Sequence, residues 1–239
     1  IRDIGVTGVQ TCALPISTLS HCSRCGKRRR RQSIFLYVTN SHNSVVGMRQ
    51  LAIKQGATFH CIDSDELEGF TTTDDWKNLE ESILSASASS TECDNGKTHV
   101  ASCIDCKNDD TPCPNLLVFP SECNFGGDRL DAKSIIAVAR ERGWYTMLDI
   151  AKHASTGDVD LNFLNPDFAS LSFYKLFGDP TGVGALLVRR SAISLLFENQ
   201  EEQKEQETNG AANSFKNRYF QGGGSVDIML PSLDYTIPD

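Results

Sequence analysis

Four residues whose side chains could take part in a reaction come directly after apolar runs of the sequence: His42, Asn124, Asp149 and Lys175. Lys175 ends the run "FASLSFYK" and is followed at once by the glycine-rich turn "LFGDPTGVG". An ammonium group between a buried strand and a tight loop costs free energy unless solvent or a reaction makes use of it. The position of Lys175 therefore indicates either a side chain that reaches the surface or a reactive amine.

Together these groups have the chemistry that binds pyridoxal 5′-phosphate. A lysine amine forms a Schiff base with the aldehyde of the cofactor. An aspartate pairs with the protonated pyridine nitrogen and keeps the ring an electron sink. An imidazole can stack on the ring face, and hydroxyl and backbone N–H groups can hold the phosphate. The sequence has one group of each kind in Lys175, Asp149 and His42, with hydroxyls at Ser172 and Tyr174.

Each of these residues also has an ordinary structural explanation. A lysine at the end of a strand usually extends along the surface into water, and an aspartate after a strand usually caps a turn. His42 could cap the helix that begins beside it. The order along the chain, which is histidine, asparagine, aspartate and lysine, favours a shared site over four unrelated roles.

Alternating strand and helix patterns would position these residues. The predicted strands are 33–39, 57–63, 115–120, 144–150, 168–174 and 184–190, and the predicted helices are 41–56, 73–84 and 131–143. Strands that alternate with helices of this length indicate βαβ units and a mostly parallel sheet covered on both faces. We therefore expect a three-layer α/β/α fold whose ligand lies beyond the carboxyl ends of the strands.

The regular pattern occupies only part of the 239 residues. Residues 33–190 are expected to form the cofactor-binding large domain, with 86–114 as a polar, Ser- and Cys-rich surface insertion. Residues 191–217 are read as a charged helix or linker, and 218–239 as a glycine-rich loop with a truncated continuation. The leader 1–32 reads as derived from a sequencing adapter or as unstructured, and is set apart from the fold.

Composition excludes some classes of protein. The formal net charge of −8 argues against a nucleic-acid partner, and no apolar run is long enough to cross a bilayer. The nine cysteines are scattered, which favours reduced thiols in a cytoplasmic protein. The CxxC pairs at Cys22/Cys25 and Cys103/Cys106 could hold zinc, and the basic run 27–31 could direct nuclear import, but an unstructured leader and a plain surface loop are the preferred explanations.

The motifs also resemble a known family. The stretches "NSHNSVVGMRQLA", "FPSECNFGGDRLD", "DFASLSFYKLFGDPTGVGALLVRR" and "YFQGGGSVD" are similar to the class V aminotransferase-like enzymes of PLP fold type I. Within them the chain resembles the molybdenum cofactor sulfurase family. The resemblance covers roughly residues 33–239, apart from the two polar segments.

The resemblance implies a role for each matching residue. Lys175 matches the Schiff-base lysine, Asp149 the aspartate at the pyridine nitrogen, and His42 the ring-stacking histidine. Asn124 matches an asparagine that contacts substrate or cofactor, and Ser172 matches a serine that contacts the phosphate.

Three further positions are carried over in the same way. Lys152 lies where bacterial cysteine desulfurases have glutamine near the ring hydroxyl, and Tyr174 replaces their histidine before the reactive lysine. Both differences are shared with the sulfurase branch. Ser225 matches a hydroxyl that reaches the phosphate of a neighbouring subunit, which implies a homodimer.

The implied reaction moves sulfur from L-cysteine, through an enzyme persulfide, to the molybdenum cofactor of xanthine dehydrogenase or aldehyde oxidase type enzymes. We expect the chain to be a fragment that lacks a phosphate-binding loop, the substrate-binding arginine and the persulfide cysteine, and to be inactive by itself. The alternative is another class V enzyme, namely a cysteine desulfurase, a selenocysteine lyase or a kynureninase-like protein.

Overall fold

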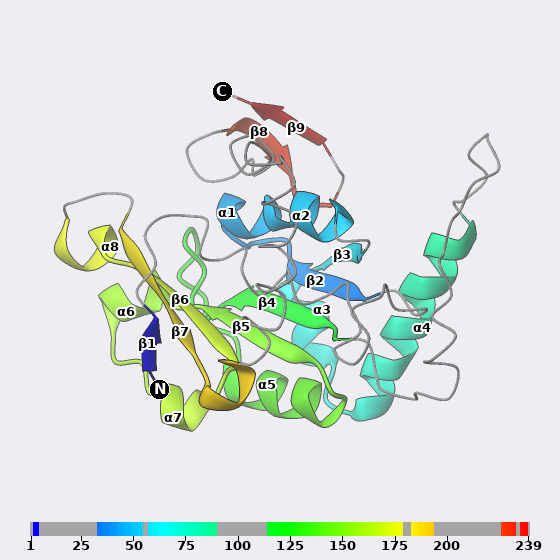
Figure 1. Cartoon of the computed structure of the whole chain (residues 1–239), viewed down its shortest axis with the longest axis horizontal. Coiled ribbons are helices and arrows are strands. Elements are labelled where there is room, and N and C mark those ends of the chain that lie inside the picture. The colour runs from blue at the N-terminus through cyan, green and yellow to red at the C-terminus, as the bar shows by residue number, and fades with distance from the viewer. Residues whose placement is uncertain are drawn as a thin grey trace, which may run out of the picture.

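The fold is built around one mixed β-sheet of seven strands (Figure 1). The computed structural model describes residues 2–4, 33–54, 57–89, 114–178, 183–193, 226–232 and 235–238. The strands lie in the order β1-β7-β6-β5-β4-β2-β3. They are β1 (Arg2–Ile4), β2 (Ile34–Val38), β3 (Thr58–Ile62), β4 (Leu116–Pro120), β5 (Tyr145–Asp149), β6 (Phe168–Ser172) and β7 (Gly184–Val188).

The central strands run parallel. Strands β3, β2, β4, β5 and β6 pair in parallel register, whereas β7 is antiparallel to both β6 and β1. The predicted mostly parallel sheet is therefore confirmed. The antiparallel edge follows from the short connection between β6 and β7, because parallel neighbours need a long crossover.

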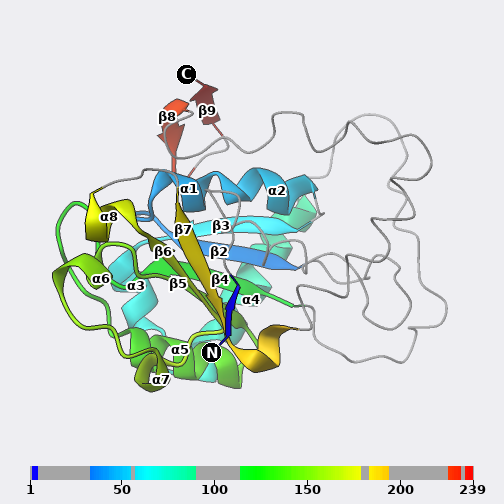
Figure 2. The same cartoon turned by 60° about the vertical axis from the view of Figure 1, so that its left-hand side comes forward.

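Helices cover both faces of the sheet, as Figures 1 and 2 show. They are α1 (Asn43–Val46), α2 (Met48–Lys54), α3 (Ser64–Gly69), α4 (Thr73–Ser89), α5 (Ala132–Glu141), α6 (His153–Thr156), α7 (Leu161–Leu164) and α8 (Tyr174–Phe177). Helices α1 and α2 lie on one face, and α3, α4 and α5 lie on the other. This arrangement is the expected three-layer α/β/α fold.

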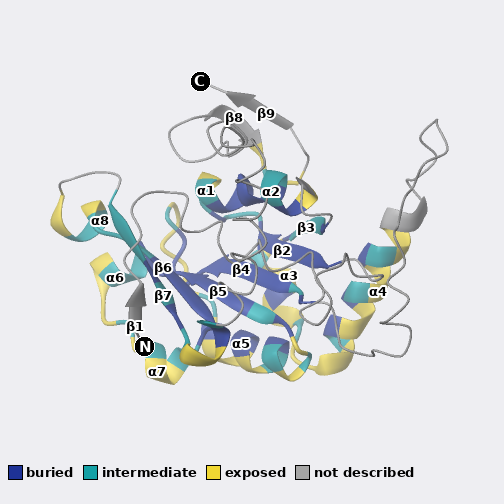
Figure 3. Cartoon of the chain, viewed as in Figure 1, coloured by how far each residue is buried: buried dark blue, intermediate teal, exposed yellow. Residues whose placement is uncertain are grey.

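Alternation along the strands produces the two cores. In β2, Ile34, Leu36 and Val38 pack toward α3, α4 and α5, while Phe35 and Tyr37 pack toward α1 and α2. All five are at most 1% exposed. A strand that is buried on both faces is uniformly apolar, which is the pattern of parallel sheets. Figure 3 shows this burial along the middle strands.

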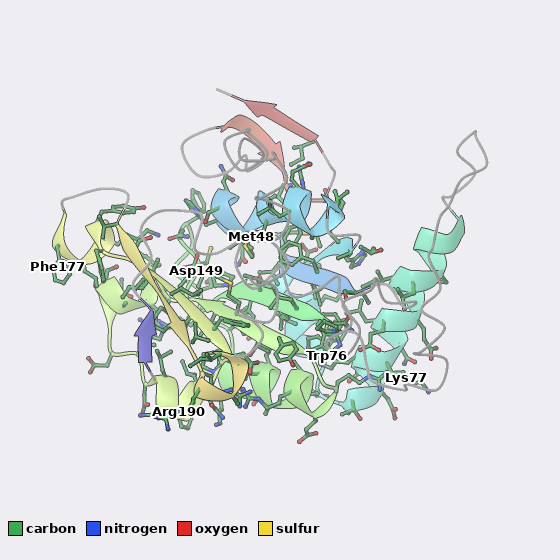
Figure 4. The ribbon with its side chains drawn as sticks, in the orientation of Figure 1. Met48, Trp76, Lys77, Asp149, Phe177 and Arg190 are labelled. Atoms are coloured by element: carbon green, nitrogen blue, oxygen red, sulfur yellow. The ribbon has the colours of Figure 1, made fainter. Side chains whose placement is uncertain are left out.

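A pair of tryptophans fixes α4 against the sheet. The rings of Trp76 and Trp144 meet edge to face with centroids 5.1 Å apart, and Phe70 packs on Trp76 at 5.8 Å. The indole N–H of Trp144 donates to Glu80 of α4. Trp76, labelled in Figure 4, lies between α4 and the strands. Aromatic side chains of this size account for much of the core free energy.

The last described residues form a separate hairpin of β8 (Val226–Leu230) and β9 (Tyr235–Pro238). Two buried side chains hold it on α1 and α2. The hydroxyl of Tyr37 donates to the carbonyl of Pro231, and the guanidinium of Arg49 donates to the carbonyl of Leu230. The hairpin therefore docks through its main chain.

Several element boundaries differ from the expectations. The helix predicted over 41–56 is two helices joined at Gly47. Strand β6 ends at Ser172, and the residues that follow form α8 instead of extending the strand. Helix α3 was not predicted, because its single buried residue, Leu67, leaves no apolar periodicity.

Two observations bear on the proposed domain limits. Helix α4 continues to Ser89, so the first residues of the expected insertion are helical. Arg2–Ile4 pair with β7, although the leader was set apart from the fold. The rest of the leader, residues 90–113 and residues 194–225 lie outside the described residues. Among the described helices, none is long and apolar enough to span a bilayer.

Candidate functional site

The strand order reverses next to β2, which has β3 on one side and β4 on the other. In open α/β sheets the crevice at such a switch point, outside the carboxyl ends of the strands, is where ligands bind. His42 follows β2, Asn124 follows β4, Asp149 ends β5, and Lys175 follows β6. The parallel register thus brings the four predicted residues to the same edge of the sheet.

Lys175 lies on α8, one short turn beyond the end of β6. Its side chain is half-buried, and its Nζ donates a hydrogen bond to Oδ1 of Asn124. Burial lowers the pKa of Lys175 below its ordinary value, and the ammonium of Lys152 lowers it further, whereas the carboxylate of Asp149 opposes them. The amine is therefore easier to deprotonate than a surface lysine, as a nucleophilic amine requires.

The chain turns sharply after α8. Gly178 ends this helix with a φ of 84°, a left-handed conformation that favours glycine. On the return path, the N–H of Phe173 donates to the carbonyl of Val183 at 3.0 Å. Gly184 faces the carbonyl of Leu171 so closely that a Cβ would clash with it. The glycines of this turn therefore allow α8 to sit against the sheet edge.

Asp149 places a carboxylate in the middle of this edge. It is 8% exposed, and its Oδ1 accepts a hydrogen bond from the N–H of Ala151 at 3.0 Å. Its neighbours in the sheet are Pro120 on β4 and Ser170 on β6. Figure 4 shows Asp149 toward the end of the sheet that carries α6 and α8. Its charge acts on the pKa values of both Lys175 and His42.

His42 is the N-cap of α1. Its Nδ1 accepts a hydrogen bond from the N–H of Ser44 at 3.2 Å and lies 2.8 Å from the Ser44 hydroxyl. Burial lowers the pKa of His42, the Lys175 ammonium lowers it further, and Asp149 acts in the opposite direction. The ring is therefore neutral near pH 7, with its proton on Nε2. The capping explanation is correct for His42, and it leaves the ring next to the charges of the site.

The other predicted residues are Lys152, Ser172, Tyr174 and Ser225. Lys152 precedes α6, and its charge acts on Lys175. Ser172 is the last residue of β6, and Tyr174 is 40% exposed on α8. Ser225 lies outside the described residues. The structure thus brings Lys175, Asn124, Asp149, His42 and Lys152 together, while Ser172 and Tyr174 are near them along the chain.

Sequence reasoning missed a polar network beside these residues. The hydroxyl of Ser121 lies 2.7 Å from Nδ1 of His153, and Glu122 accepts hydrogen bonds from Arg129 and Thr156. Ser121 and Glu122 are 3% and 5% exposed. The sequence contained one signal for this network: Glu122 follows the apolar strand β4 by two residues, and a carboxylate that is buried there needs hydrogen-bond partners.

The described residues contain no group of three or more histidine, cysteine, aspartate or glutamate side chains that could hold a metal ion. The cysteines considered as zinc ligands lie outside these residues. Cys61 and Cys123 are described, and both are free thiols. Burial raises the pKa of Cys61 to about 11, so that thiol is a poor nucleophile.

Comparison with known proteins shows what the chain is similar to. A family model described as Aminotransferase class-V matches residues 94–200. A molybdenum cofactor sulfurase from Bombyx mori is 34% identical over 208 residues, covering 85% of this chain and 21% of the relative. One from Arabidopsis thaliana is 33% identical over 220 residues, covering 86% of this chain and 23% of the relative.

Solved structures agree on the fold. The cysteine desulfurase CsdA from Escherichia coli superposes with a TM-score of 0.52 and 17% identity, over 99% of this chain and 45% of that one. The fold is therefore that of PLP fold type I enzymes, as predicted. Residues 94–200 match the class V aminotransferase family model, and this match together with the fold supports pyridoxal 5′-phosphate as the cofactor.

In overall sequence the chain is similar to molybdenum cofactor sulfurases. The chain spans about a fifth of the length of the sulfurases that it matches.

Proposed function

We propose that the edge of the sheet around Lys175 holds pyridoxal 5′-phosphate and carries out the cysteine-desulfurating step of a sulfurase. One observation carries the proposal: the half-buried Lys175 amine has a lowered pKa, is hydrogen-bonded to Asn124, and lies close enough to Asp149 and Lys152 for their charges to act on its pKa. An amine that deprotonates easily, a buried carboxylate and a neutral imidazole are the donor set that this cofactor needs.

Each residue has a distinct role in this proposal. The neutral amine of Lys175 would attach the cofactor, and the Asp149 carboxylate would accept a hydrogen bond from the protonated pyridine nitrogen. His42 offers a flat, uncharged ring for stacking, Asn124 would contact substrate or cofactor, and Lys152 would lie near the ring hydroxyl. Ser172 would supply a hydroxyl for the phosphate, Ser225 would supply one for the phosphate of the neighbouring subunit, and Tyr174 borders the site. When bound, the cofactor supplies an electron sink that stabilises negative charge at the α-carbon of the substrate.

The substrate and the acceptor are inferred from the relatives. We infer that the whole protein takes sulfur from L-cysteine and delivers it to the molybdenum cofactor, because its relatives are named for that sulfuration. We further infer a cytoplasmic homodimer whose enzyme persulfide forms on a cysteine other than the described Cys61 and Cys123. Burial suits neither of these two thiols to that role.

Trapping the cofactor tests the proposal. The chain is incubated with pyridoxal 5′-phosphate, treated with borohydride, digested and mapped by mass spectrometry. We expect one predominant label, on Lys175. Labels distributed over exposed lysines such as Lys77 and Lys133, with none on Lys175, would refute the site. Sulfide release from L-cysteine by the same preparation tests the expectation that residues 1–239 alone are inactive.

A further inference from the structure

Two segments that flank the Lys175 amine are joined by one buried carboxylate. The first is the loop after β4, which carries Asn124, and the second is α6, which is preceded by Lys152. Glu122 lies in the first segment and is only 5% exposed. Its Oε2 accepts hydrogen bonds from Nε of Arg129 at 2.8 Å and from the hydroxyl of Thr156, in α6, at 2.6 Å.

The hydrogen bond between Glu122 and Thr156 also connects to the backbone of Lys152. The Thr156 hydroxyl also lies 3.3 Å from the carbonyl oxygen of Lys152 and 3.1 Å from that of His153. A hydroxyl has one proton, and the shortest of its contacts is with Glu122. A second contact runs parallel to the first, since the Ser121 hydroxyl lies 2.7 Å from Nδ1 of His153. The loop and α6 are therefore held to each other twice.

Glu122 stays ionised in this position. The hydrogen bond from Thr156 lowers the pKa of Glu122 most, the Arg129 guanidinium and the nearby His153 lower it further, and burial opposes them. Charge-assisted hydrogen bonds are stronger than neutral ones and fix their partners more tightly. A buried carboxylate bound in this way is suited to hold two segments at a fixed separation.

We propose that Glu122 is a positioning residue that holds Asn124 and Lys152 on either side of the Lys175 amine. The inference rests on the proposed function only in treating Lys175 as the cofactor lysine. Asn124 accepts the hydrogen bond of the amine, and Lys152 adds a like charge beside it. Glu122 contacts neither the amine nor, in the proposed function, the cofactor.

Removing the link should change the surroundings of the amine in a defined direction. The charged groups that act on Lys175 are Asp149 from β5 and Lys152 from the start of α6, and the Lys175 ammonium in turn lowers the pKa of His42 at the N-cap of α1. If the loop and α6 separate, water reaches the amine and Lys152 moves away. Both changes raise the pKa of Lys175, because burial is the main cause of its lowering. Losing the negative charge of Glu122 without movement would instead lower that pKa.

Competitive acetylation of the cofactor-free chain separates these effects. The rate at each lysine is followed against pH by mass spectrometry. We expect Glu122→Ala to shift the midpoint of Lys175 to higher pH and to slow its labelling severalfold at neutral pH. Glu122→Gln places an amide oxygen where Oε2 was but removes the charge, so its midpoint should equal that of the parent or lie slightly below it. Thr156→Val removes the same link with no change of charge, so it should shift the midpoint in the same direction as Glu122→Ala.

Glu141→Ala, an exposed change on α5, is the matched control and should leave the midpoint unchanged. The proposal is overturned if Glu122→Ala leaves the midpoint in place or lowers it, or if Glu122→Gln moves it as far. Thr156→Val provides the decision if Glu122→Ala does not fold. A shifted midpoint in a chain that never attaches pyridoxal 5′-phosphate would refute the proposed function and leave this inference standing.

Discussion

Two buried aspartates occupy opposite ends of the same sheet and have different surroundings. Asp149 ends β5, whereas Asp167 precedes β6 and is 1% exposed. Asp167 accepts hydrogen bonds from the N–H of Thr146 at 2.9 Å and from its hydroxyl at 3.0 Å. Arg189 forms an ion pair with it, and Arg140 lies 4.0 Å away. Figure 4 shows Arg190, the residue after Arg189, at this end of the molecule.

The difference lies in where the partners come from. The carboxylate of Asp167 is neutralised by groups of its own surroundings, which tie β5, β6, β7 and α5 together. The carboxylate of Asp149 accepts one hydrogen bond from its own backbone turn and acts on the charges of Lys175 and His42. A buried charge whose partners are all structural stabilises the fold, whereas one that faces reactive groups sets their protonation.

The largest expected effect comes from Lys175→Ala. Without the amine, pyridoxal 5′-phosphate has no covalent attachment, so the absorbance of the bound cofactor and the borohydride-stable label should both disappear. Spectroscopy and peptide mapping measure the loss. Lys77→Ala, which alters an exposed lysine of α4, should retain both signals (Figure 4). If Lys175→Ala still formed a borohydride-stable link with the cofactor, Lys175 would not be the attachment residue, and Asp149 would not belong to a cofactor site around it.

Asp167→Asn should give the largest loss of stability. Removing one partner of a buried ion pair typically costs about 3–5 kcal/mol, and solvation of the partly exposed arginines should reduce this to about 2–4 kcal/mol. Urea unfolding of the cofactor-free chain measures the change. Asp149→Asn is the matched control, and its free energy of unfolding should stay within about 1 kcal/mol of the parent, because its loss breaks one hydrogen bond. Equal losses in the two variants would remove the distinction between the aspartates.

Asp149→Asn should instead act on the site. Asp149 raises the pKa of Lys175, so its neutralisation should lower that pKa further and move the labelling midpoint to lower pH. A charge-assisted hydrogen bond contributes about 1.5–3 kcal/mol, so cofactor affinity should fall about ten- to hundredfold. Equilibrium dialysis and competitive labelling give the two values. Asp167→Asn should change neither, and a matching fall in affinity there would show that both effects come from disturbed folding.

The sequence predicted the edge of the sheet better than the details of the site. Strand patterns placed His42, Asn124, Asp149 and Lys175 at carboxyl ends, because burial on two faces produces runs that are easy to recognise. The switch of the chain into α8 after Ser172 was missed, since four residues are too few for helical periodicity.

The partners of buried polar groups were also beyond sequence reasoning. Glu122 and Thr156 are separated by 34 residues, and only the parallel pairing of β4 and β5 brings them together. Asp167 reads as an ordinary turn residue until Arg140 and Arg189 are seen beside it. Local propensity contains no information on such contacts, which depend on tertiary register.

The smallest expected effect is a dependence of stability on pH that arises mainly at the site. Burial lowers the pKa of His42 below the value of 6.5 expected in the unfolded chain. A group with a depressed folded pKa contributes stability that is present above pH 6.5 and is lost as the pH falls through the folded pKa, because the unfolded state then binds more protons.

The pKa values of His60 and His153 are lowered for the same main reason, so the three contributions add. Replacing His42 by Gln, which keeps a side-chain acceptor near Ser44, should flatten part of the decline in melting temperature below pH 6.5. Thermal unfolding of the cofactor-free chain from pH 8 to pH 5 tests this. The hydrogen-bond and ion-pair partners of Asp167 are Thr146, Arg140 and Arg189. Because none of the three titrates between pH 5 and pH 8, Asp167→Asn should lower the curve at every pH without flattening it. If the curve of His42→Gln ran parallel to that of the parent, folding would not lower the pKa of His42.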